Sequence, residues 1–105
     1  MTTLQDREKE FETRFKHDQE LQFKVNTRRN RLLGLWAAER MGLPAEDAAA
    51  YAKSVVDAAF GGGTKTVIAK VTTDLNAKGD GVTVDQVKFE LDHLAATARQ
   101  QVMAA

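Results

Sequence analysis

The side chains best suited to chemistry in this chain are cations that could bind an anion. Arg28, Arg29 and Arg31 lie within four positions of one another, and Lys24 precedes them by one helical turn. The planar guanidinium of arginine matches the geometry of phosphate oxygens. A solvated basic stripe, or one that meets acids on a neighbouring helix, is the simpler interpretation of the same residues. We therefore keep the arginines as candidates for nucleotide or anion binding.

A second candidate for anion binding is the run from Gly61 to Thr66, which contains three glycines followed by Thr64 and Lys65. Backbone N–H groups at the start of a helix can hold an anion, and Lys65 could add a charge. The run departs from the phosphate loop of nucleotide triphosphatases, because Thr64 separates glycine from lysine and a helix is expected before it. A flexible loop between two helices explains the glycines without any ligand.

The chain shows no assembled set of catalytic or metal-binding residues. It has no cysteine, and its two histidines, His17 and His93, are far apart and lack metal-ligand spacing. Ser54 is the only serine and falls inside an expected helix, without the sharp turn that presents a nucleophile. The carboxylates lie in runs of mixed charge, which do not shift pKa values as catalytic pairs require. We predict no enzymatic activity, no metal and no cofactor.

Length and charge narrow the class of protein further. The chain has 105 residues, which is enough for one domain. Fifteen basic and fifteen acidic residues cancel, which argues against a nucleic-acid-binding protein. The longest apolar run, from Leu32 to Ala38, is too short to span a bilayer, and the charged N-terminus does not resemble a signal peptide. We expect a cytoplasmic protein without direct membrane insertion.

Apolar spacing and glycine positions predict an all-α fold with four helices. The helices are expected over residues 3–41, 44–60, 65–77 and 83–104. Gly42 and Pro44 should end the first helix, and Thr83 with Gln86 should begin the last through a capping box. Gly34 lies inside the first helix, where glycine costs about 1 kcal/mol relative to alanine, and we expect a neighbouring helix to pass close to the backbone there. We expect a four-helix bundle domain over residues 19–105.

Each expected helix carries an apolar face toward the core of this bundle. Three- and four-residue spacings define these faces. The predicted core residues are Leu21, Val25, Leu32, Trp36, Ala48, Tyr51, Ala52, Val55, Val56, Ala59, Val67, Ile68, Val71, Leu75, Val84, Val87, Leu91, Leu94, Ala95, Ala98 and Val102.

Residues 1–18 differ from the rest of the chain. Leu4, Phe11 and Phe15 share one helical face, and charges of alternating sign fill the positions between them. Three large apolar side chains offset little of the backbone entropy that ordering the segment would cost. We predict a mobile amphipathic segment that becomes helical when its apolar stripe meets a groove on a partner. The alternative is that the stripe extends the first helix along the bundle.

Several stretches of the sequence resemble a known family. Residues 6–8, 14–21 and 28–39, the last with Gly34, Leu35 and Trp36 in order, are similar to the alphaproteobacterial F-type ATP synthase zeta subunit, an ATPase inhibitor family. Residues 50–56 are also similar. The likeness is tight over residues 4–60 and loose beyond Phe60, where the glycine run stands in place of the family's acidic, proline-containing loop.

The resemblance implies a regulatory subunit that is monomeric when free and associates peripherally with the inner membrane through the ATP synthase. It would bind the catalytic head, formed by the alpha, beta and gamma subunits, and block ATP hydrolysis by inserting its N-terminal helix between catalytic subunits and rotor. The family also implies weak adenine nucleotide binding. Two alternatives stay open, a nucleotide-binding helical module and a non-inhibitory protein associated with the ATP synthase. The partner-binding residues carried over onto this chain are Leu4, Arg7, Phe11, Arg14 and Phe15.

Overall fold

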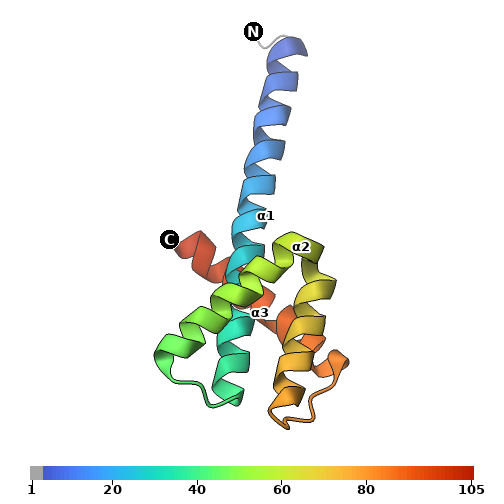
Figure 1. Cartoon of the computed structure of the whole chain (residues 1–105). Coiled ribbons are helices and arrows are strands. Elements are labelled where there is room, and N and C mark those ends of the chain that lie inside the picture. Colours follow the sequence, from blue (N-terminus) through green and yellow to red (C-terminus); the bar gives the residue numbers. More distant parts are fainter. Residues whose placement is uncertain (1–3) are drawn as a thin grey trace.

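The computed structural model describes residues 4–105, and the side chains from residue 16 onward. Residues 4–105 form three helices, α1 (Leu4–Arg40), α2 (Ala45–Ala77) and α3 (Val84–Ala104) (Figure 1). No strand occurs between residues 4 and 105, so the all-α prediction is confirmed for this part of the chain. None of its helices combines the length and the apolar character that crossing a membrane would need.

The predicted count of four helices is not confirmed, because α2 continues through the glycine run. Gly61 and Gly62 are helical, and only Gly63 leaves the helical conformation, with φ 72° and ψ −158°. Figure 1 shows the resulting bend, which divides α2 into two legs. This backbone conformation is open almost only to glycine. A single residue therefore turns the chain where a loop was expected.

The predicted helix ends are confirmed by their hydrogen bonds. Gly42 adopts φ 70° and donates its N–H to the Glu39 carbonyl at 3.0 Å, while Leu43 donates to the Ala38 carbonyl at 3.0 Å. This pair of bonds is the Schellman motif, which satisfies the last carbonyls of α1. At the start of α3, Thr83 and Gln86 form both hydrogen bonds of the capping box.

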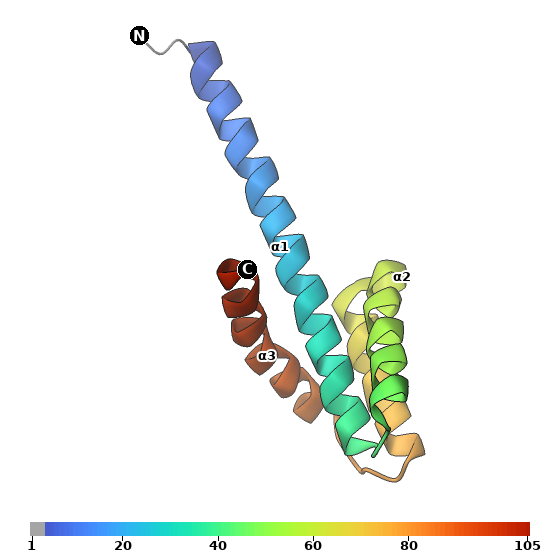
Figure 2. The same cartoon turned by 90° about the vertical axis from the view of Figure 1, so that its left-hand side faces the viewer.

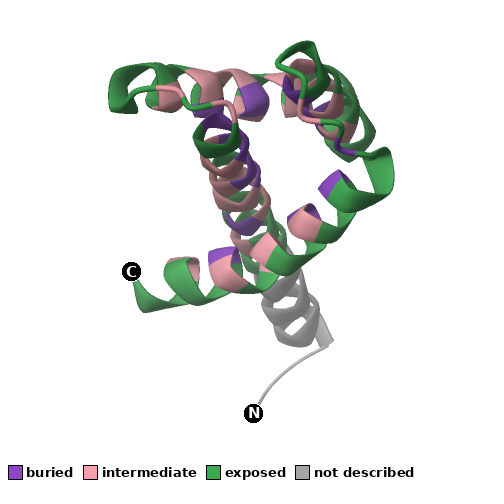
Figure 3. Cartoon of the chain, turned by 90° about the horizontal axis from the view of Figure 1, so that it is seen from below, coloured by how far each residue is buried: buried purple, intermediate pink, exposed green. Residues whose placement is uncertain are grey.

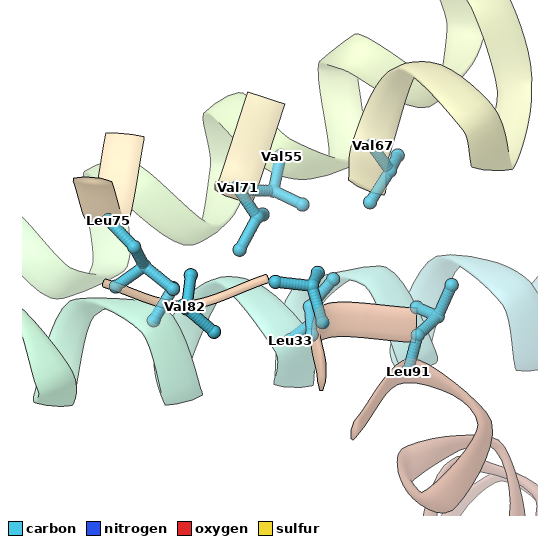
Figure 4. Packing of buried hydrophobic residues seen from close by; sticks show 9 residues of the cluster. Leu33, Val55, Val67, Val71, Leu75, Val82 and Leu91 are labelled. Carbon is cyan, nitrogen blue, oxygen red and sulfur yellow. The ribbon is translucent and has the colours of Figure 1, made fainter. Parts of the chain in front are cut away.

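The core lies where α2 and α3 pack against the C-terminal half of α1. Figure 2 shows α3 and α2 on opposite sides of α1, and Figure 3 shows the buried residues on the inward faces of the helices. The close-up in Figure 4 shows how side chains from all three helices meet. The fully buried large side chains are Leu33, Val55, Val67, Val71, Leu75, Val87 and Leu91.

The buried face of α1 is displaced from the predicted one. Leu33 and Ala37 are fully buried, whereas Leu32 and Trp36 stay half-buried. Both α2 and α3 pack against α1. The most deeply buried residues of α1 are therefore those that lie between its contact with α2 and its contact with α3, and they are not the residues with the largest side chains. Val84 was also predicted to lie in the core. This prediction is wrong, because Val84 is 53% exposed in the first turn of α3.

Gly34 marks the closest approach of two helices, as predicted. A Cβ atom at this position would lie 2.6 Å from the Cα of Ala52 in α2. Real Cβ atoms do not come this close to backbone, so any larger residue would push α1 and α2 apart. The absence of a side chain at Gly34 therefore allows the two backbones to cross in contact.

The N-terminal part of α1 extends beyond the other two helices (Figures 1 and 2). The molecule measures 64 × 24 × 21 Å, and its long dimension follows this helix. Residues 16–20 are all exposed, and the first buried residue along the described part is Val25. Of the predicted segment 1–18, residues 1–3 lie outside the described residues and the remainder is helical. Its mobility stays a prediction.

Candidate partner-binding surface

The extended part of α1 contains all five predicted partner-binding residues. Their backbone is helical, and their side chains lie outside the described part of the structure. Helical spacing places the five positions on one face, within an arc of about 100°. A continuous helix joins this face to the packed core without a hinge or loop. The five positions are Leu4, Arg7, Phe11, Arg14 and Phe15.

Below the extension, α1 becomes strongly basic. No acid occurs from Leu21 to Ala38, whereas this stretch carries four cations. Three of the cations line a groove of about 460 Å³ between α1 and the end of α3. No residue lining the groove is buried, so it is a shallow surface feature. Its lining residues are Leu21, Phe23, Lys24, Thr27, Arg28, Arg31, Val102 and Ala105.

The predicted anion-binding residues do not gather at one site. Arg28 and Arg31 are three positions apart, share a face of α1 and line the groove. Arg29 lies beside the kink of α2, where its guanidinium donates to the Oγ1 of Thr64 at 3.3 Å. Lys65 is exposed next to Thr64. The four residues therefore divide between two places.

Arg29 has a structural role at the kink. Its Nε and Nη2 both donate to the Oδ1 of buried Asn30 at 3.2 Å, in addition to the bond with Thr64. Partial burial desolvates the guanidinium and lowers the pKa of Arg29, and the charge of Asp92 opposes this shift. These contacts fasten α1 to the bend of α2 and leave Arg29 little freedom to reach a ligand.

An exposed aromatic pair joins α1 to α2 near the same bend. The side chains of Phe23 and Phe60 are 56% and 68% exposed, and their ring centroids lie 6.1 Å apart at an interplanar angle of 40°. Neither phenylalanine is among the residues that the sequence predicted for binding. The pair's only sequence signal is that each phenylalanine lies off the apolar stripe of its helix, with Phe60 directly before the glycine run.

Two polar clusters stabilise the fold away from this surface. The Tyr51 hydroxyl donates to Asp74 Oδ2 at 2.8 Å and so links the two legs of α2, and Lys70 Nζ donates to the same oxygen at 2.9 Å. At the other end, Arg40 forms two bonds with Asp80, at 2.9 and 2.6 Å. The Arg40 guanidinium also lies 5.1 Å from the ring centre of Trp36.

The described side chains contain no group of three or more histidine, cysteine or carboxylate residues that could hold a metal ion. The polar clusters consist of ion pairs and hydrogen bonds between neighbouring helices or turns, without an exposed nucleophile and base.

Comparison with known proteins identifies one matching family. The model of the family described as ATPase inhibitor subunit zeta matches residues 1–101. A structure solved by solution NMR shares 39% sequence identity with the chain, covering 80% of this chain and 96% of that one, with a TM-score of 0.70. No curated protein matches the chain.

Proposed function

The chain belongs to the ATPase inhibitor subunit zeta family, and we propose that it stops ATP hydrolysis by inserting the N-terminal part of α1 into the catalytic head of an F-type ATP synthase. Membership of this family makes the protein a regulatory inhibitor and not an enzyme, and it implies an ATP synthase as the partner. The inserted helix would lie between the catalytic subunits and the rotor.

The extension of α1 beyond the bundle is the observation that supports this proposal. A single helix with its side chains is about 10–12 Å across, whereas the whole molecule measures 24 × 21 Å across its long axis. A gap between subunits could admit the helix and exclude the bundle. The bundle would then remain outside and limit the depth of insertion.

Insertion would act by steric block. Rotation of the rotor requires the surrounding subunits to move past it, and a helix wedged between them would oppose that movement. The side chains at Leu4, Phe11 and Phe15 would enter apolar pockets, while Arg7 and Arg14 would pair with acids of the partner. Because α1 is continuous with the core, force on the inserted part would pass directly to the bundle.

Deletion of residues 1–18 tests the mechanism. We expect the shortened protein to lose inhibition of ATP hydrolysis by the purified cognate head and to keep its helical fold, because burial in the core begins at Val25. The readouts are a titration of ATPase activity and a thermal unfolding curve followed by circular dichroism. If the shortened protein inhibits as well as the full chain, insertion is not the mechanism.

A point change refines the same test. Phe11→Ala should weaken inhibition by about tenfold or more if the aromatic side chain anchors the inserted helix. Phe89→Ala is the matched control, because Phe89 is 73% exposed on α3 and lies beside Trp36 and Arg40, far from the extension. Equal inhibition by the two variants would exclude an anchoring role for Phe11.

The two alternative functions predict different results. A non-inhibitory associated protein would bind the head without lowering ATPase activity. A nucleotide-binding module would show chemical-shift changes at Arg28 to Arg31 or at Gly61 to Lys65 on addition of ATP. Of these residues, Arg28 and Arg31 line one groove. The groove is shallow and has no buried lining residue, whereas small-ligand sites enclose most of the ligand surface. The geometry therefore supports the nucleotide-binding alternative less well than inhibition by insertion.

A further inference from the structure

We propose that the bundle carries a second docking surface, which holds an acidic and partly apolar region of the same head that receives the N-terminal part of α1. This surface, here called the root surface, consists of Phe23, Phe60, Lys24, Arg28 and Arg31. The inference rests on the proposed function, because it names a further contact with the same partner. It assigns a role to residues outside the inserted segment.

The apolar component of the root surface is the pair of Phe23 and Phe60. Both rings are more than half exposed, although burying an aromatic side chain would gain stability. The ring of Phe23 comes from α1 and that of Phe60 from α2 just before the bend at Gly63. The kink thus holds two aromatic side chains side by side before any partner arrives. Pre-positioned aromatic residues are frequent anchors of protein interfaces.

The charged component is the row of Lys24, Arg28 and Arg31. Among the described side chains, ion pairs join Arg40 to Asp80 and Lys70 to Asp74, and neither pair involves this row. Along α1 the nearest acid is Glu20, one turn before Lys24, and it forms no ion pair with Lys24. Three unpaired cations in one groove favour a partner with complementary negative charge. The region of the partner that contacts this row is therefore acidic, and the region beside it, which contacts the two phenylalanines, is apolar.

The extent of the root surface favours a protein over a small anion. Its groove has no buried lining residue, and Phe60 lies outside the groove on a different helix. A small ligand could not cover both the cations and the aromatic pair. Phe23 follows Phe15 by about 12 Å along the helix axis. Phe23 is also rotated by about 80° from Phe15 around that axis, and the cationic row lies roughly opposite the face of Leu4, Phe11 and Phe15. A partner must therefore enclose α1 from more than one side to reach both surfaces.

Two full-length variants test the proposal, one for each component. Phe60→Ala removes the exposed ring, and the double variant Lys24→Glu with Arg31→Glu reverses two exposed charges. The matched controls are Phe89→Ala and Lys88→Glu, which alter one exposed ring and one exposed cation on α3. Binding to the purified cognate head is measured as rates and Kd at low and high salt, with ATPase inhibition in parallel.

We expect Phe60→Ala to raise the Kd by about tenfold. The charge reversal should slow association at low salt, and the difference from wild type should shrink at high salt because ions screen the charges. The two controls should bind as the wild type does. All variants should keep the wild-type unfolding midpoint, since the altered side chains are exposed.

The outcomes separate this inference from the proposed insertion. If both root variants bind and inhibit like wild type while deletion of residues 1–18 abolishes inhibition, the root surface is wrong and insertion stands. If the root variants lose binding while the deletion still inhibits, insertion is wrong and the root surface stands. If the charge reversal abolishes shifts caused by ATP but leaves binding to the head intact, the cations serve a nucleotide and the inference is overturned. A full chain that does not bind the head overturns both.

Discussion

At the residue scale, Gly34 shows how one position determines the distance between two helices. An alanine there would favour the helix by about 1 kcal/mol. Its Cβ would, however, lie 2.6 Å from the Cα of Ala52, and backbone cannot yield as a flexible side chain does. Forced overpacking of this kind costs about 1–3 kcal/mol. The steric cost should therefore exceed the gain in helix propensity.

We accordingly predict that Gly34→Ala lowers the free energy of unfolding by up to about 2 kcal/mol, measured by urea denaturation. Gly61→Ala is the control, because Gly61 is helical and a Cβ at that position meets no atom within 4 Å. The control should leave stability unchanged or raise it. Equal stability of both variants would show that α1 and α2 can separate at no cost.

Tyr51 is a second residue whose effect can be predicted. Its hydroxyl donates to Asp74 across the bend of α2, and burial, together with the hydrogen bond and charge of that carboxylate, raises the pKa of Tyr51. We predict that Tyr51→Phe destabilises the protein by about 1–2 kcal/mol at neutral pH, because one hydrogen bond to a charged acceptor is lost. Urea denaturation of both proteins measures the difference.

The sign of the pH dependence follows from the raised pKa. The native state holds the Tyr51 proton more tightly than the unfolded chain, so the contribution of this residue is present below the ordinary tyrosine pKa of about 10. It is lost as pH rises from there toward the raised value. The stability advantage of wild type over Tyr51→Phe should shrink above pH 10. An advantage that grows with alkaline pH would contradict this assignment.

At the element scale, Asp80 joins the connection between α2 and α3 to the end of α1. Two hydrogen bonds from Arg40 lower the pKa of Asp80 below that of an ordinary aspartate. A lowered pKa means that the contribution to stability is present above the unfolded value and is lost as pH falls through the folded value. The contact should therefore be effective at neutral pH and absent in strong acid.

We predict that Asp80→Asn lowers the unfolding midpoint at pH 7, and that its difference from wild type disappears as pH falls below about 4. Thermal unfolding across this pH range measures the effect. Asp57→Asn is the control, since Asp57 is exposed on α2 and forms no ion pair among the described side chains. A pH-independent difference for Asp80→Asn would exclude its ionised carboxylate as the cause.

The kink of α2 is the element whose form the sequence did not predict. The three glycines indicated a break, and the expectation of a separate loop followed from their usual effect on helices. The structure instead places one non-helical residue, Gly63, directly between the two helical legs of α2. Arg29 bonding to Thr64 and Tyr51 bonding to Asp74 hold the bend at either side. These bonds depend on helices that the sequence alone does not orient.

At the scale of the whole molecule, the structure divides into a packed bundle and a helical extension. Packing protects backbone hydrogen bonds, whereas a single solvated helix frays readily. We predict that in the free protein the backbone amide hydrogens before residue 20 are among the fastest to exchange with solvent. Those around Leu33, Val71 and Leu91 should exchange slowest. Hydrogen exchange followed by NMR makes this comparison within one sample.

Strong protection across residues 4–15 in the monomer would contradict the predicted mobility. It would instead favour a helix that is stable before it meets the partner. Measurement at several protein concentrations is the control, because association of the apolar face at Leu4, Phe11 and Phe15 would also slow exchange.

The sequence by itself determined the local features of this protein. The end of α1 at Gly42 and the capping box of Thr83 were predicted, because each depends on conformational rules and on contacts within a few positions. A close approach at Gly34 was predicted from a glycine inside a helix, but its partner, Ala52 of α2, was not. The distinct composition of residues 1–18 could also be recognised from the sequence alone. The similarity of residues 28–39 to the zeta family was also evident before any coordinates, and the family match confirmed it.

Only the tertiary structure decided how separated residues combine. It places Phe23 beside Phe60. It places Arg29 at the kink of α2, apart from Arg28 and Arg31 in the groove. In α1 it buries Leu33 more fully than the predicted Leu32. Each outcome depends on where one helix crosses another and on the direction in which Gly63 turns the chain. Helical periodicity fixes which residues share a face, but side-chain packing between helices selects which face is buried.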